Sequence, residues 1–254
     1  MKPVLIELGH LEVTSYGVSK ALAALVGGWL LTRELRRVGR DPELAWALTI
    51  AAALGGFAGA KLYYLAERGS EISLHDLGGM GFTWYGGLLG GAAAVLLVAR
   101  LRGIPASLMA GISAVPLAVA YGIGRIGCLL AGDGTYGIAS DLPWAMSFPE
   151  GTVPTTEQVH PTPLYEALAA FAIAALLWRL RTRLSPLALF ALFAVLMGAS
   201  RFLVEFVRRQ EEIVAGLTAP QLWSAAFVAV GAVIAFRLSG GRLQPGPSGA
   251  PGGR

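Results

Sequence analysis

Two arginines stand inside long apolar stretches of this sequence, where a charged side chain is costly. Arg125 lies in a run of glycine and aliphatic residues, and Arg201 is followed four residues later by Glu205. Arginine presents a planar fork of donors that binds the oxygens of a phosphate or a carboxylate in a bidentate manner. Charges placed in such stretches are candidates for a functional site by default. These residue types therefore indicate recognition of an anion.

The apolar stretches are long enough to cross a lipid bilayer, which takes about 20 residues. Of the 254 residues, 55% are hydrophobic and 14% are charged, and the mean hydropathy is +0.61. Soluble domains carry roughly 25% charged residues. The sequence predicts an all-α polytopic membrane protein with seven transmembrane helices, at residues 14–33, 43–66, 82–100, 105–130, 162–181, 185–206 and 219–237.

Positive charge alternates between the loops that join these stretches. Arginines follow the first, third, fifth and seventh stretches: Arg33, Arg36, Arg37, Arg40, Arg100, Arg102, Arg179, Arg181, Arg183, Arg237, Arg242 and Arg254. Residues 133–157 contain no Lys or Arg. Loops rich in Lys and Arg stay in the cytoplasm. We therefore expect the N-terminus outside, the C-terminus in the cytoplasm, and residues 131–161 as an external loop.

Composition also limits domains and partners. Residues 1–238 are expected to form a single membrane domain, and the Gly/Pro-rich residues 239–254 are expected to be a disordered cytoplasmic tail. The pI near 9.5 follows from the loop arginines, so we expect no nucleic-acid partner. No histidine spacing typical of a metal site occurs, and no metal or cofactor is expected.

With this topology, six stretches place a polar side chain at one level near the outer face: Tyr16, Lys61, Tyr85, Arg125, Glu166 and Arg201 with Glu205. Taken singly, these charges have a structural explanation as ion pairs, Arg201 with Glu205 and Arg125 with Glu166 or Asp133. Taken together, they indicate a polar cavity open to the outer leaflet. A lipid phosphate is the anion available at that depth.

The segment from Gly122 to Gly127 matches the G-x-G-x-x-G fingerprint of dinucleotide-binding proteins. That fingerprint has meaning only when a strand precedes it and a helix follows. Here it lies inside an apolar stretch, which excludes the nucleotide interpretation. Glycines in such stretches permit close helix packing, as we also expect for the G-x-x-x-G pairs Gly55/Gly59 and Gly86/Gly90.

Several motifs together resemble the prolipoprotein diacylglyceryl transferases. They are "LEVTSYG", "GAKLYY", "YGGLLGG", "GRIGCLLAGDGTYG", "DLPWAMSFPEG", "HPTPLYEA" and "RFLVEFVR", in the family's order over roughly residues 9–237. The resemblance implies a bacterial inner-membrane enzyme with its active site toward the outer side. Its reaction would transfer the sn-1,2-diacylglyceryl group of phosphatidylglycerol to the lipobox cysteine thiol in a prolipoprotein signal peptide.

The resemblance also implies roles for particular residues. Arg125 and Arg201 match the family's two functional arginines, Tyr16 its N-terminal tyrosine, and Glu205 the acid after the second arginine. The chain departs from the family at four positions, with Tyr85 for histidine, Cys128 for asparagine, Asp133 for glutamate and Met197 for tyrosine.

The missing histidine leaves the general base open among Tyr85, His160, Glu166 and Glu205. We expect Arg125, Arg201, Tyr85, Glu205 and His160 to take part in catalysis, and the lipid to contact Arg125, Arg201, Tyr16, Lys61, Asp133 and Glu166. A phenol ionises near pH 10 and is a poor base at neutral pH. Two alternatives remain: a relative that binds lipid without catalysis, and a small membrane transporter, whose charges would lie nearer the midplane.

Overall fold

Seven α-helices dominate the computed structural model, which describes residues 2–8, 11–69, 83–210, 212–214 and 216–240. They are α1 (Ser15–Arg37), α2 (Leu44–Arg68), α3 (Trp84–Leu101), α4 (Ala106–Ala131), α5 (Thr162–Leu180), α6 (Pro186–Glu205) and α7 (Ala219–Gly240). Each coincides with one predicted stretch to within a few residues. Residues 241–254 of the expected tail lie outside the described part.

The helices have the length and composition of a polytopic membrane protein. Within the described residues, α2, α4, α5, α6 and α7 are long and apolar enough to span a bilayer. α3 contributes a shorter apolar helix, and α1 carries Lys20, Arg33 and Glu34 within its length. Large apolar side chains such as Leu54 and Phe236 are 67% and 77% exposed. Exposed apolar surface of this kind suits contact with lipid.

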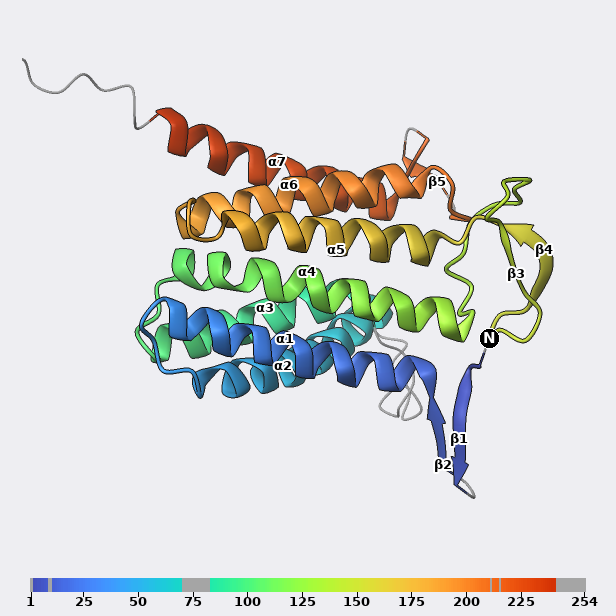
Figure 1. The fold of residues 1–254 in the computed structure, drawn as a ribbon, viewed down its shortest axis with the longest axis horizontal. Coiled ribbons are helices and arrows are strands. Elements are labelled where there is room, and N and C mark those ends of the chain that lie inside the picture. The colour runs from blue at the N-terminus through green and yellow to red at the C-terminus, as the bar shows by residue number, and fades with distance from the viewer. Residues whose placement is uncertain (1, 9–10, 70–82, 211, 215, 241–254) are drawn as a thin grey trace, which may run out of the picture.

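α4 lies at the centre of the helical arrangement. It packs against α1, α5 and α6, while α2 packs on α3 and α6 on α7. Figure 1 shows the helices running side by side in two groups, with α4 between α1 and α5. One apolar core joins α1 to α4 around Leu35 and Ile112, and another joins α4 to α5 and α6 around Val115 and Leu177. α4 is thus the element against which the site helices are held.

The glycines of α2 and α3 let the two helices touch backbone to backbone. A methyl group placed on Gly59 would lie 2.7 Å from the Cα atom of Gly90, and one on Gly55 would lie 2.7 Å from the carbonyl oxygen of Gly90. No side chain fits at these distances. The close packing predicted from the two G-x-x-x-G pairs is confirmed.

The Gly122–Gly127 segment lies inside α4, which begins at Ala106, so sixteen residues of helix and not a strand lead into it. A methyl group on Gly122 would lie 2.7 Å from the ring of Phe171 on α5, and one on Gly127 would lie 2.5 Å from Ser19 on α1. These glycines bring α4 close to its two neighbours. The nucleotide interpretation is excluded, as the sequence predicted.

Three antiparallel strand pairs, which were not predicted, lie beside the helix ends. They are β1 (Val4–Leu8) with β2 (Leu11–Thr14), β3 (Met146–Phe148) with β4 (Thr155–Val159), and β5 (Glu212–Val214) with β6 (Leu217–Thr218). Figure 1 shows the labelled strands gathered at one end of the molecule, which we call the hairpin end. The connections 38–43, 102–105 and 181–185 lie at the opposite end.

The loop between α4 and α5 has a small core of its own at the hairpin end. α4 ends at Ala131 and is capped by Gly132, whose φ of 57° is left-handed and whose N–H bonds to the carbonyl of Cys128 at 3.0 Å. Beyond it, Tyr136 and Phe148 stack with ring centroids 5.0 Å apart over Val159. The loop is therefore an ordered structure that covers the ends of the site helices.

Candidate active site

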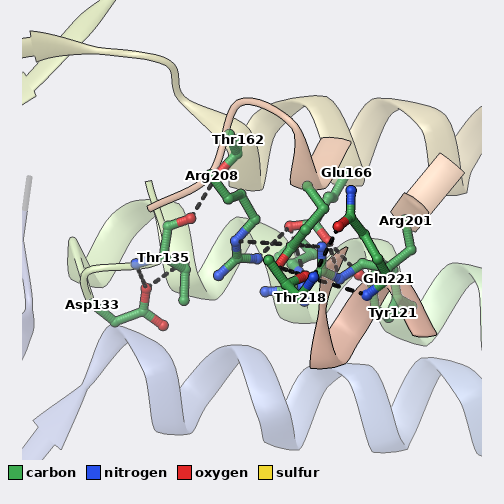
Figure 2. A network of polar contacts seen from close by, with 11 residues as sticks. Tyr121, Asp133, Thr135, Thr162, Glu166, Arg201, Arg208, Thr218 and Gln221 are labelled. Atoms are coloured by element: carbon green, nitrogen blue, oxygen red, sulfur yellow. Dashed lines mark hydrogen bonds and ion pairs between the residues drawn. The ribbon is translucent and has the colours of Figure 1, made fainter. Parts of the chain in front are cut away.

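The candidate active site forms where α4 and α6 end and α5 and α7 begin. Arg201 and Glu205 lie one turn apart on α6. After the helix, the N–H of Arg208 bonds to the carbonyl of Glu205 at 3.0 Å, which keeps the chain turning in the same sense. Spacings of four and seven residues place all three side chains on one face. Figure 2 shows Arg201 and Arg208 directed toward Glu166 of α5.

Glu166 is the centre of this network. Its Oε1 accepts a 2.6 Å hydrogen bond from the hydroxyl of Tyr121 and lies 3.4 Å from Nε of Arg201. Its Oε2 lies 3.3 Å from Nε of Arg125 and 3.3 Å from Nη1 of Arg208. The side chain is 1% exposed. One buried carboxylate therefore joins arginines from α4, from α6 and from the segment after α6.

Glu205 forms the second carboxylate of the network. Its Oε2 pairs with Nη1 of Arg201 and lies 3.8 Å from Nε of Arg208, while its Oε1 accepts a 3.0 Å hydrogen bond from the hydroxyl of Thr218. The backbone N–H of Thr218 in turn donates a 3.0 Å hydrogen bond to Oε1 of Gln221, at the start of α7. The two carboxylates thus connect four helices.

The charges of the network do not cancel. Three guanidinium groups share two carboxylates, which leaves one positive charge in excess. The side chains of Arg125 and Arg201 are 17% and 19% exposed, whereas those of Arg208, Glu166 and Glu205 are 6%, 1% and 0% exposed. Arg125 and Arg201 are therefore the two arginines that a ligand can reach, and the excess charge suits an anion.

Both ion pairs expected from the sequence are present, Arg201 with Glu205 and Arg125 with Glu166. The structural explanation and the functional one are thus not exclusive, because the pairs are fused through Glu166 into one cluster with excess charge. Burial lowers the pKa of the Arg208 guanidinium below its ordinary value, and the negative charge of Glu166 partly offsets this effect. The pairing with carboxylates is what lets a third arginine be buried there.

Arg208 and Tyr121 are members of the network that sequence analysis missed. Arg208 follows the end of the predicted sixth stretch at residues 185–206, Tyr121 lies within the predicted fourth stretch, and neither residue was assigned a role. A signal was available in both cases, since Arg208 follows Glu205 by three residues and Tyr121 precedes Arg125 by four. Both spacings put the two side chains on one helical face.

Tyr85, in the first turn of α3, borders the network from the side of α7. Its ring stacks on that of Trp223 with centroids 5.1 Å apart. Its hydroxyl is close enough to Arg201 and Glu205 to interact electrostatically with both. The structure therefore brings the residue at the expected histidine position to the same site as the arginines.

Asp133 contacts the covering loop. Its Oδ1 accepts hydrogen bonds from the hydroxyl of Thr135 at 2.6 Å and from the N–H of Thr135 at 3.2 Å. The hydroxyl of Thr162, at the start of α5, bonds to the carbonyl of Thr135 at 2.6 Å. Figure 2 shows this chain of contacts beside the arginine network. In these contacts Asp133 shapes the loop that leads to α5.

His160 lies just before α5 and borders a separate cavity. Its Nδ1 is 3.3 Å from the hydroxyl of Tyr165, and that hydroxyl accepts a 2.8 Å bond from the indole N–H of Trp144. These three residues line a cavity of about 530 Å³ together with Leu142, Leu164, Leu168 and Val207. The contacts described for His160 do not include the arginines.

Tyr16 and Lys61 are placed at the hairpin end of α1 and in the second half of α2. Tyr16 is 42% exposed, and Nζ of Lys20 lies 4.9 Å from the centre of its ring. Nζ of Lys61 lies 5.4 Å from the ring of Tyr64. Their described partners are thus neighbours on their own helices.

Comparison with known proteins identifies the family to which this site belongs. Residues 3–237 match the family model described as prolipoprotein diacylglyceryl transferase. The chain belongs to this family. Three relatives named phosphatidylglycerol–prolipoprotein diacylglyceryl transferase illustrate the similarity. The Clostridium tetani protein is 34% identical over 82% of this chain and 86% of its own length. The Azotobacter vinelandii protein is 36% identical over 81% of this chain and 80% of its own length. That of Rhodospirillum rubrum is 32% identical over 99% and 96%.

Membership in the prolipoprotein diacylglyceryl transferase family confirms the resemblance drawn from the sequence motifs. The chain is accordingly a membrane-embedded transferase of lipoprotein biosynthesis. Three of the motifs that carried the resemblance, around Arg125, Glu166 and Arg201, supply the side chains of the buried network. The family's signature segments thus converge on one site.

Proposed function

We propose that this chain transfers the sn-1,2-diacylglyceryl group of phosphatidylglycerol to the thiol of a lipobox cysteine, with the phosphate held by Arg125 and Arg201. The observation that carries the proposal is the network of three arginines and two carboxylates, with its excess positive charge and its two reachable guanidinium groups. Phosphatidylglycerol supplies the matching single negative charge at the depth of the helix ends.

The reaction exchanges one bond for another at a glycerol carbon. A sulfur–carbon bond forms, the bond from that carbon to the phosphate oxygen breaks, and glycerol phosphate leaves. Negative charge gathers on the leaving oxygen, where two fixed guanidinium groups stabilise it. Glu166 and Glu205 hold those groups in place before substrate arrives, so little reorganisation is needed.

The thiol must lose a proton, because the thiolate is the nucleophile. Both oxygens of Glu166 and of Glu205 are already engaged by arginine or hydroxyl groups. Either carboxylate would have to break a contact to accept a proton. His160 borders a cavity, and imidazole is the side chain most often used for proton transfer near neutral pH. We therefore rank His160 ahead of Glu166 and Glu205 as the base and assign Tyr85 an orienting role.

Tyr16, Lys61 and Asp133 are proposed to line the lipid's path.

We also propose the arrangement in the membrane. All seven helices cross the bacterial inner membrane, residues 1–238 form one domain, and residues 239–254 extend into the cytoplasm. The support is the arginine-rich character of one set of loops and the absence of Lys and Arg from residues 133–157. The hairpin end, with the arginine network, then faces outward, where a secreted acceptor chain is delivered.

The direct test is a reconstitution with defined substrates. The purified chain is incubated with phosphatidylglycerol and a peptide that carries a lipobox cysteine, and the peptide is then weighed by mass spectrometry. We expect the added mass of one diacylglyceryl group, with release of glycerol phosphate, and no change for a peptide with serine in place of the cysteine. Retention of phosphatidylglycerol without product would overturn the catalytic proposal in favour of a lipid-binding relative.

A further inference from the structure

A second cavity lies toward the opposite end, away from the arginine network. It measures about 290 Å³ and is lined by Trp29 and Arg33 of α1, Val115 and Val119 of α4, and Phe171 and Trp178 of α5, with other small or apolar residues. Trp178 follows Glu166 by twelve residues on α5, which places it ~18 Å farther along the helix axis. The reaction described above makes no use of this cavity.

Two arginine–tryptophan pairs stand at its edges. The guanidinium carbon of Arg33 lies 4.0 Å from the ring centre of Trp29, and that of Arg181 lies 3.1 Å from the ring centre of Trp178. Such contacts orient a guanidinium over the ring face. Both tryptophans line the cavity. The cavity therefore has apolar walls and positive charge beside them.

The positive charge at this edge is incompletely neutralised. Glu34 is buried and pairs with both Arg37, at 2.6 Å, and Arg181, at 3.0 Å. In the part of the chain that the structure describes, no carboxylate pairs with Arg33. Arg37 and Arg181 thus share one carboxylate, whereas Arg33 is exposed and is the arginine that lines the cavity. An anion is the complement of this edge.

The lining of the cavity favours a lipid chain. Eight of its nine lining residues are apolar or aromatic, and Arg33 is the one charged residue among them. A flexible acyl chain adapts to an irregular apolar groove of this kind. α1 and α5 both pack on α4, so a chain lying between them would fill the groove that this arrangement leaves.

We propose that this cavity binds a phospholipid with an anionic headgroup, with an acyl chain between Trp29 and Trp178 and the phosphate on Arg33. Basic pockets between helices at a membrane surface bind such headgroups. The lipid belongs to the leaflet at the opposite end and is distinct from the donor at the arginine network. This inference does not depend on the proposed reaction.

Tryptophan fluorescence gives the test, because Trp29 and Trp178 would touch the lipid. The purified full chain is titrated in detergent with phosphatidylserine carrying brominated acyl chains, which quench nearby tryptophans, and separately with brominated phosphatidylcholine. We expect quenching at lower concentrations of phosphatidylserine. Arg33→Gln should reduce that preference about fivefold, as expected for one basic residue near a membrane surface. The Trp29→Phe variant should lose the share of the phosphatidylserine-specific quenching that comes from Trp29, and Trp178 should supply the remainder.

Arg102→Gln is the matched control, because it removes the same charge from the end of α3 at the same end of the molecule. It should leave the preference unchanged, and an unchanged melting temperature shows that each variant is folded. Equal quenching by both lipids in the wild type would overturn the proposal, as would an Arg33→Gln variant that keeps the preference. An equal loss in Arg102→Gln would show a diffuse charge effect and no site. Each outcome is read without the transfer assay.

Discussion

At the level of single residues, Glu166 determines the geometry of the candidate site. It is buried and contacts Tyr121, Arg125, Arg201 and Arg208 at 2.6 to 3.4 Å. Without its charge, three guanidinium groups from different segments would repel one another with only Glu205 between them. A carboxylate at this position therefore serves both stability and the placement of the two reachable arginines.

Replacement of Glu166 by glutamine should destabilise the protein strongly. Removing one partner of a buried ion pair costs about 3–5 kcal/mol, because the remaining charges stay buried. Glu157→Gln is the control, since Glu157 and its partner Arg209 are 62% and 40% exposed and such pairs contribute ~0–1 kcal/mol. Thermal unfolding of both variants in one detergent gives the comparison. Equal melting temperatures would contradict the role assigned to Glu166.

Tyr85 provides a separate test of the proton acceptor. Its ring packs on Trp223 beside Arg201, so we expect it to orient substrate. Tyr85→Phe should then keep a substantial fraction of the transfer rate, and Tyr85→His should add no new inflection to the pH profile. An inactive Phe variant that His rescues, with an inflection near pH 6 to 7, would instead make position 85 the base.

The site was predictable from sequence in part. Arg125, Glu166, Arg201 and Glu205 were found because charges in apolar stretches are rare, and the structure brings all four together. Arg208 was missed because it follows the end of α6, where charges are ordinary. Its spacing of three residues from Glu205 indicates a shared face only if the chain keeps turning, and the bond to the carbonyl of Glu205 shows that it does and brings Arg208 to Glu166.

At the level of elements, the contact of α2 with α3 depends on glycine. Gly59→Ala should weaken this contact, because the new methyl group would lie 2.7 Å from the backbone of Gly90. Forcing the helices apart costs about 1–3 kcal/mol. Gly27→Ala is the control, as the nearest atom to its methyl group is 3.6 Å away. Thermal unfolding that shows no difference between the two variants would contradict the packing described here.

The helices were predictable and the strand pairs were not. A stretch of about 20 apolar residues in lipid must satisfy its backbone internally, which leaves the helix as the choice for a single span. The strands have two to five residues and mixed polarity, so periodicity carries little information. Their positions depend on tertiary contacts, such as the 2.8 Å bond from the N–H of Gly137 to the carbonyl of His160.

At the level of the whole molecule, the two ends differ in composition and in cavities. The hairpin end carries the network with two reachable arginines, and the opposite end carries the arginine-rich connections. If the proposed orientation holds, the donor lipid and the secreted acceptor meet at the outer face. The hairpin end is also where the loop 131–161 covers the site helices.

Accessibility of single cysteines tests that orientation. In a Cys128→Ala background, Thr156→Cys places a thiol on exposed β4, and Arg183→Cys places one on an exposed connection at the opposite end. An impermeant thiol reagent added to intact cells should label the first and not the second. The reverse pattern would invert the topology and move the active site to the cytoplasmic face.

The central claim is that Arg125 and Arg201 bind the phosphate through their planar forks, and one comparison of transfer rates tests it directly. Arg125→Lys and Arg201→Lys keep the charge but lose the bidentate geometry. We expect thioether formation from phosphatidylglycerol to fall at least ~100-fold in each, the usual effect of removing a transition-state donor. Arg102→Lys, at the exposed end of α3, should keep the wild-type rate. If both site variants transfer at the wild-type rate, the phosphate is bound elsewhere.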